Sequence, residues 1–219
     1  MRNKEKDALQ MAKKREDFLS NSYELFVKKN IESVSMLEVA KESGYGVATL
    51  YRYFPSKPIL VVSVATWIWE NAIEDTQIRN KENDFKELSA AEVLDLFLNF
   101  FIKIYKESRE LLRFNQLFNI YICSEKIDSD VLKPYRDMID NGKDIFHLIY
   151  EKGKQDHTIR TDESEEEMFS TLLHLMLAAA TRYAIGLVYI PKKGFDAEKE
   201  LSRLKEALLM RYVIPDQLK

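Results

Sequence analysis

The chain has 219 residues, of which 46% are hydrophobic and 32% charged, so it can bury a substantial core and is not intrinsically disordered. Its formal net charge of −3 excludes a generally basic protein that binds nucleic acid non-specifically. Six glycines, five prolines and little strand-like alternation favour an all-α fold. One cysteine, Cys123, excludes an internal disulfide framework and is typical of a reducing compartment.

Charge is distributed unevenly along the chain. Residues 1–60 carry 11 basic and 8 acidic residues, a net charge of +3, whereas residues 61–219 carry 22 and 28, a net charge of −6. We call residues 1–60 the head and residues 61–219 the body. A basic head on an acidic body fits a protein that docks DNA in one orientation. The first fifteen residues hold six basic and two acidic side chains, which either follow the DNA backbone or minor groove or form a loosely ordered terminus.

The first predicted elements are a helix over about 8–29 and a helix-turn-helix over 35–57, SMLEVAKESGYGVATLYRYFPSK. Ser35 and Glu38 fit the S-x-x-E capping box of a helix start. Gly44 stands where the chain must stop and reverse, a position that favours a residue tolerant of positive φ. This order of signals predicts a short helix followed by a tight turn.

A second short helix is predicted from Val47 to about Phe54. Leu50 and Phe54 are spaced i, i+4 and should face the core, with Tyr45 packing against the turn. The outward side is then left to the remaining residues of the helix, including Arg52. The alternative is a helical hairpin without a ligand, but the length and order of the motif favour a unit that reads duplex DNA.

The rest of the chain reads as further helices, which makes about nine in all. Ser89-x-x-Glu92 is a second capping box, and Pro134 lies early in its helix, where proline is tolerated. The predicted helices after the head run over about 57–79, 89–106, 108–123, 128–153, 162 or 164 to 188, and 196–213.

Residues from about Arg15 to Leu60 resemble the DNA-binding domain of the TetR (tetracycline-repressor-like) family of bacterial transcriptional regulators. The resemblance is carried by Phe26, Ser35-x-x-Glu38-Val39-Ala40, Gly44, Thr49-Leu50-Tyr51-x-Tyr53-Phe54 and Ser56-Lys57-x-x-Leu60. It implies a DNA-binding head over residues 1–56 and a helical ligand-binding and dimerisation domain over 57–219. It also implies a homodimeric, ligand-responsive regulator, most simply a repressor.

The resemblance implies roles for single residues of the head. Ser35 would cap its helix and offer its hydroxyl to a phosphate, and Thr49 and Tyr51 would lie in or beside the major groove. Tyr53 and Lys57 would contact phosphates, which fix register without carrying sequence information. The full set of expected DNA-binding residues is Ser35, Gly46, Val47, Ala48, Thr49, Tyr51, Arg52, Tyr53 and Lys57.

Two positions depart from the family pattern. Gly46 stands where a serine or threonine commonly caps the recognition helix, although glycine is an acceptable cap. Val47 occupies an outward position often held by a polar residue. With Ala48 and the methyl of Thr49 it forms a small apolar tip, which suits thymine methyl groups better than guanine. We therefore expect modest direct readout, with DNA shape contributing.

In the family this body binds a small, often apolar ligand, and an unknown effector is therefore expected. Most candidates for binding it are aromatic residues at helical spacing, and the plain alternative for such a stripe is core packing. The plain alternative for a lone histidine is a core residue whose hydrogen bonds are satisfied. The candidate ligand-binding residues are Trp67, Phe97, Phe101, Tyr105, Phe114, Phe118, Tyr121, His174 and Arg182.

The segment 171–186, TLLHLMLAAATRYAIG, has a smooth alanine surface that allows another helix to approach closely. The resemblance implies a homodimer through this segment and the last helix, because one head reads only one half-site of a palindrome. The alternative is close packing within one chain. The candidate interface residues are Thr171, His174, Ala178, Ala179, Arg182, Leu201, Leu204 and Leu208.

No further chemistry is expected. The three histidines and Cys123 do not have metal-ligand spacing, and no P-loop, G-x-S-x-G or G-x-G-x-x-G motif occurs. We expect no enzyme, no cofactor and no membrane span, since the longest apolar stretch, 59–69, is short. A cytoplasmic protein is therefore expected. A ligand carrier and a protein-interaction module remain as alternatives.

Overall fold

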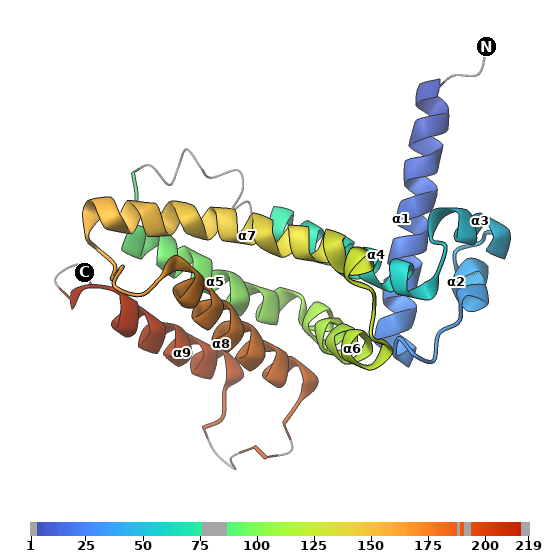
Figure 1. The fold of residues 1–219 in the computed structure, drawn as a ribbon. Helices are drawn as coiled ribbons and strands as arrows, with labels where there is room; N and C mark the ends of the chain where they lie inside the picture. Colours follow the sequence, from blue (N-terminus) through green and yellow to red (C-terminus); the bar gives the residue numbers. More distant parts are fainter. Residues whose placement is uncertain (1–3, 76–86, 188, 191–193, 216–219) are drawn as a thin grey trace. The chain divides into compact units, whose positions relative to one another are not determined.

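The computed structural model describes residues 4–75, 87–187, 189–190 and 194–215 (Figure 1). Within these residues the chain forms nine α-helices and no β-strand, which confirms the predicted all-α fold. The helices are α1 Lys4–Lys29, α2 Met36–Glu42, α3 Val47–Tyr53, α4 Lys57–Asp75, α5 Ala90–Glu107, α6 Arg109–Glu125, α7 Ser129–Asp156, α8 Glu165–Ile185 and α9 Ala197–Tyr212. The predicted helix ends at 76–79 and 188 lie outside the described residues.

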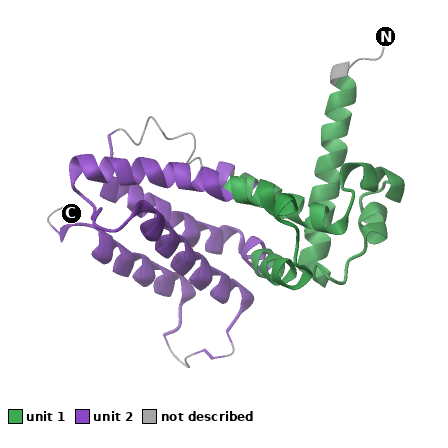
Figure 2. Ribbon diagram, in the orientation of Figure 1, with its two compact units in different colours: residues 1–70, 114–138 green, residues 71–113, 139–219 purple. Residues whose placement is uncertain are grey.

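The chain divides into two compact units (Figure 2). Unit 1 comprises residues 1–70 and 114–138, and unit 2 comprises residues 71–113 and 139–219. The chain passes between the units within α4, α6 and α7, so each of these helices contributes residues to both. The predicted functional boundary at residues 56 and 57 stays a prediction.

The core of unit 1 is organised around Phe18 of α1, whose side chain is fully buried. Its ring lies 5.1 Å from that of Tyr45, 5.7 Å from that of Tyr53 and 6.4 Å from that of Phe54, measured between centroids. Leu50 is also fully buried, so the predicted inward face of the second short helix is confirmed. Burying an aromatic side chain stabilises a fold by about 1.5–3 kcal/mol, and these rings therefore fix α3 on α1.

Capping side chains account for where several helices begin. Ser89 and Ser164 form complete capping boxes with Glu92 and Glu167 at the starts of α5 and α8. The box predicted at the start of α2 forms only in part. Ser35 Oγ accepts the Glu38 amide at 3.2 Å, but the Glu38 carboxylate pairs with Lys29 Nζ at 2.5 Å instead of turning back.

Unit 2 is built on α5, which packs against α8 and α9. An aromatic cluster forms part of its core. The Phe97 ring lies 5.7 Å from that of Phe101 and 5.6 Å from that of Phe146, and Phe146 lies 5.5 Å from Phe169. These contacts join α5 to α7 and α8. Phe97 and Phe101 of the aromatic stripe therefore pack within a helical bundle.

Among the described helices, α8 is long and apolar enough to span a bilayer by length and composition, although sequence analysis expected no such segment. Core helices of globular proteins meet the same criterion, so α8 does not by itself indicate a membrane protein. Its amphipathic burial provides a simpler account: Leu172 and Met176 are fully buried, whereas Leu175 and Ala178 are exposed.

Substitution by serine should change the free energy of unfolding in opposite directions at two glycines of the head. Gly44 has φ +74°, whereas Gly46 has φ −69° and would place an added Cβ in open space. Gly44→Ser should lower the free energy of unfolding by about 1 kcal/mol, because a side chain strains this backbone. Gly46→Ser should raise it by about 0.5 kcal/mol, because the hydroxyl caps α3.

Urea unfolding followed by circular dichroism measures both changes, and each variant is the matched control for the other. Shifts of the same sign would contradict this account of the turn.

Candidate DNA-binding site

The turn between α2 and α3 is held by short-range and long-range contacts. The amide of Gly44 donates to the Lys41 carbonyl at 3.1 Å, and that of Tyr45 donates to the Ala40 carbonyl at 3.0 Å. The Tyr45 hydroxyl donates to Asp17 Oδ2 of α1 at 2.6 Å, and this hydrogen bond raises the pKa of the tyrosine. Both the ring of Tyr45, which packs on Phe18, and its hydroxyl thereby hold the turn against α1.

The outward side of α3 presents the predicted base-reading residues. Val47 is 36% exposed and Tyr51 47% exposed, while Ala48 is exposed and Thr49 is half-buried. Gly46 takes the N-cap position with extended backbone and no side-chain cap, as its sequence position predicted. The exposed start of α3 is therefore small and largely apolar.

Other residues of the head supply polar groups. Arg52 is exposed in the last turn of α3, and Tyr53 is half-buried against Phe18. Ser35 is exposed, and although its oxygen caps α2, its hydroxyl hydrogen remains available to an acceptor. These groups have the chemistry of phosphate contacts around a helix that enters a groove.

Lys57 is not free in this arrangement. Its Nζ donates to the Glu32 carbonyl at 2.9 Å and lies 6.0 Å from the centroid of the Tyr121 ring. Burial lowers the pKa of this lysine. Its ammonium group has three N–H donors, so two remain for a phosphate beside the bond to the Glu32 carbonyl.

The candidate ligand-binding residues do not form one group. In unit 1, Phe114, Phe118 and Tyr121 are buried in the hydrophobic core, and Trp67 is half-buried against it. Burial raises the pKa of Tyr121 to about 12. The Phe114 ring stacks on Phe26 of α1 at 6.4 Å. These four residues thus contribute to core packing, which was the plain alternative.

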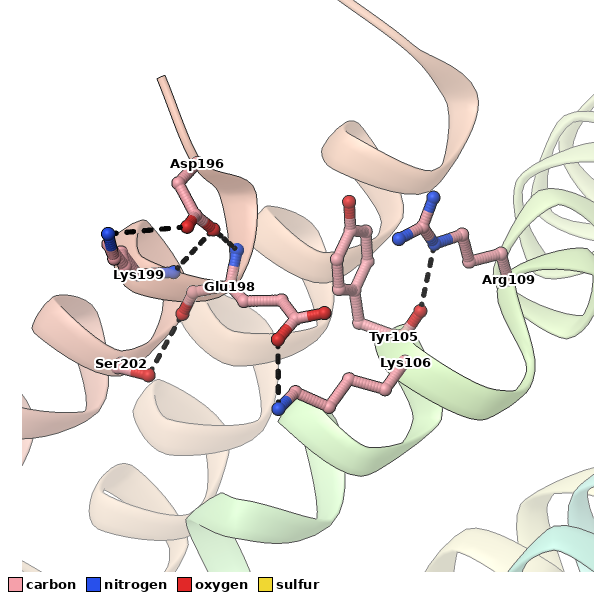
Figure 3. A network of polar contacts seen from close by, with 7 residues as sticks. All are labelled: Tyr105, Lys106, Arg109, Asp196, Glu198, Lys199 and Ser202. Atoms are coloured by element: carbon pink, nitrogen blue, oxygen red, sulfur yellow. Dashed lines mark hydrogen bonds and ion pairs between the residues drawn. The ribbon is translucent and has the colours of Figure 1, made fainter. Parts of the chain in front are cut away.

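In unit 2, Phe97 is half-buried, while Phe101 and Tyr105 are buried. Tyr105 lies in a polar network at the end of α5 and the start of α9 (Figure 3). Arg109 Nε donates to the Tyr105 carbonyl at 3.2 Å, and its guanidinium carbon lies 4.6 Å from the ring centroid. Lys106 Nζ lies 2.8 Å from Glu198 Oε2, which ties the two helices together.

The other two ligand candidates, His174 and Arg182, are exposed on α8. His174 Nδ1 lies 3.2 Å from Ser170 Oγ, within hydrogen-bonding distance. The structure does not gather these two side chains with Tyr105 or with the phenylalanine cluster of unit 2. Their exposure makes them surface groups of the chain.

The candidate dimer residues fall into two groups. Thr171, His174, Ala178 and Arg182 are exposed, and Ala179 and Leu204 are half-buried. In contrast, Leu201 is fully buried and Leu208 is buried within unit 2, because α9 packs against α5 and α8. These two leucines have little area left for a second chain.

Two features of unit 2 were not predicted from the sequence. Leu175 and Ile185 of α8 and Met210 of α9 are exposed, and their apolar type alone did not distinguish them from core leucines. His147 and Glu151, spaced i, i+4 on α7, come together with Glu165 of α8. The i, i+4 pair was visible in the sequence, but its partner beyond the turn was not.

Comparison with known proteins agrees with this geometry. The family model for bacterial regulatory proteins of the tetR family matches residues 18–64, which span the helix-turn-helix and the start of α4. An HTH-type transcriptional regulator of Staphylococcus aureus is 26% identical over 147 residues, which cover 60% of this chain and 76% of that protein.

Solved structures share the fold over nearly the whole chain. A transcriptional regulator from Saccharomonospora viridis in complex with choline has a TM-score of 0.68 at 16% identity, covering 93% of this chain and 99% of that one. FadR from Bacillus subtilis in complex with stearoyl-CoA has a TM-score of 0.67 at 16% identity, covering 88% and 96%. At these identities the likeness concerns the fold.

The head and the comparisons together define a helix-turn-helix transcriptional regulator. Residues 18–64 match the DNA-binding domain of the tetR family of bacterial regulatory proteins.

Removal of a hydroxyl from two tyrosines of the head should have different consequences. Tyr45→Phe should lower the free energy of unfolding by about 1–2 kcal/mol, because it leaves the Asp17 carboxylate without its donor. Tyr51→Phe should change it by less than about 0.5 kcal/mol, because that side chain is exposed. Thermal unfolding measures both effects, and equal losses would show that the Tyr45 hydroxyl does not secure the turn.

Proposed function

We propose that the protein is a homodimeric repressor that binds a palindromic operator and is released by a small, largely apolar effector. Each chain inserts α3 into the major groove, and the two heads read half-sites one helical turn apart, or a multiple of one. The DNA target implies a cytoplasmic protein. The proposal depends most on one observation: the outward face of α3 is exposed, while aromatic side chains buried beneath the helix hold it in place.

The chemistry of that face determines the expected readout. Val47, Ala48 and the Thr49 methyl offer apolar contact to thymine methyl groups, and the first turn of α3 contains no arginine or glutamine fork for guanine or adenine. Tyr51 adds a phenol beside them. Affinity then comes mainly from phosphate contacts and from DNA shape, and specificity from a few apolar contacts.

The exposed apolar residues of α8 and α9 support a homodimer. Leu175, Ile185 and Met210 present large apolar side chains to solvent, and Ala178 lies one turn from Leu175 on α8. A partner chain would bury these side chains, and apolar patches on a surface commonly mark interaction sites. A second copy is the natural partner, because a symmetric dimer matches a palindrome.

The effector is proposed from two sources. The aromatic cluster of Phe97, Phe101, Phe146 and Phe169 gives unit 2 an apolar interior. Two proteins of similar fold have structures with choline and with stearoyl-CoA. An effector releases the operator only if it binds more tightly to the form of the dimer that does not hold DNA.

Selection of bound duplexes from a random pool at fixed, moderate salt tests this function. Enrichment of one palindrome bound by two chains is the expected result. Binding without enrichment would refute specific readout by α3. An absence of binding by folded protein would favour a ligand carrier or a protein-interaction module.

Loss of a phosphate contact and loss of a base contact should have different effects on DNA binding in mutants of the head. Lys57→Ala should weaken binding to all duplexes by a similar factor and reduce the salt slope by about 1, because one phosphate contact is lost. Thr49→Val, which replaces a hydroxyl by a methyl group, should instead change the preferred sequence. Fluorescence anisotropy across a salt series measures both effects.

Lys103→Ala, at a partly exposed lysine of α5, is the matched control for Lys57→Ala and should leave the slope unchanged. A uniform loss in both head variants would refute the division between positioning and readout.

The proposed interface predicts a change of mass in solution. The parent protein should sediment with twice the mass of one chain, which is 25.7 kDa. Ala178→Arg should raise the dimer dissociation constant by about 100-fold or more, because it buries a charge without a partner. Ile120→Arg, at an exposed apolar position of α6, is the control. An unchanged dimer in Ala178→Arg would exclude this face of α8.

A further inference from the structure

One cluster of metal-binding side chains lies in unit 2, between α7 and α8. His147 and Glu151 are one turn apart on α7 and share a face, and Glu165 is the first residue of α8. One donor atom from each of the three residues lies within 4.8 Å of the other two. His147 Nδ1 and Glu165 Oε2 are 2.9 Å apart. The three donors therefore converge from two helices on one place.

The connection between the two helices holds this geometry in place. The Tyr150 hydroxyl donates to the Glu163 carbonyl at 2.7 Å and to the Thr161 carbonyl at 3.3 Å. A Cβ added to Gly153 would lie only 2.3 Å from Ile159 Cγ1, so the end of α7 and the segment after it pack closely. Because these contacts flank the cluster, the two helices are already ordered, and binding of an ion costs little further conformational entropy.

We propose that His147, Glu151 and Glu165 bind a divalent first-row transition metal, and Zn²⁺ in particular. One imidazole nitrogen and two carboxylate oxygens form a donor set that such ions accept, whereas Mg²⁺ and Ca²⁺ favour oxygen donors alone. Three ligands from the chain leave at least one position of the ion open to water or to a donor atom of a bound molecule.

The existing contacts of the cluster can give way to an ion. A metal ion would take the place of the hydrogen bond between His147 and Glu165, because a metal-bound imidazole nitrogen and carboxylate carry no proton. Glu151 pairs with Lys154 at 2.6 Å, but both side chains are more than two fifths exposed. Exposed ion pairs are weak and readily exchanged. Lys143 pairs with the neighbouring Glu166 and leaves Glu165 free of that contact.

A bound ion would join α7 to α8 beyond the hydrogen bonds already present. It would stabilise unit 2 by mass action, since the three donors are brought together only in the folded chain. The site lies on α7 and α8 and does not depend on the DNA-binding proposal.

Isothermal titration of the full chain with zinc chloride tests the site. The experiment uses a Cys123→Ser background, because that cysteine is free and exposed and thiolates are zinc ligands. We expect one saturable zinc site per chain and a rise in the thermal midpoint with zinc. The heat should be absent when magnesium chloride replaces zinc chloride.

Two matched pairs of variants locate the site. His147→Asn and Glu165→Gln should each lower zinc affinity by at least about tenfold, as loss of a ligand requires. His157→Asn and Glu166→Gln alter the same residue types nearby and should leave it unchanged. Circular dichroism without zinc verifies folding. The absence of saturable binding, or equal affinity in all four variants, would overturn the proposal.

Discussion

The proposed reading surface depends on the packing of aromatic side chains around Phe18. This ring of α1 contacts Tyr45 in the turn and Tyr53 and Phe54 at the end of α3. The Tyr45 hydroxyl adds a hydrogen bond to Asp17 of the same helix. Because α3 has only seven residues, it is too short to be stable alone, and these tertiary contacts determine its position.

Because these buried contacts hold α3 in place, its outward side is available to contact DNA. A short helix with an apolar tip can contribute few hydrogen bonds to bases, so most of the binding free energy must come from the phosphates. A basic head on an acidic body suits this balance, since repulsion from the body favours one docking orientation. Lys57 connects the head to α4, where its present partner is the Glu32 carbonyl.

Local signals in the sequence predicted the helices well, because capping residues, glycine at positive φ and i, i+4 burial act over short distances. Ser89, Ser164 and Gly44 illustrate these signals. Contacts between distant residues were not predictable in this way. The Glu38 carboxylate turns to Lys29, Leu201 faces the interior, and His147 meets Glu165 beyond the turn. Each outcome depends on which helices become neighbours.

In the proposed complex, the start of α3 lies against thymine methyl groups in the major groove. Photo-crosslinking of a selected duplex carrying 5-bromouracil in place of thymine tests it directly, with the crosslinked peptides identified by mass spectrometry. We predict crosslinks within residues 47–51. Crosslinks confined to the N-terminal segment or to unit 2 would contradict the account.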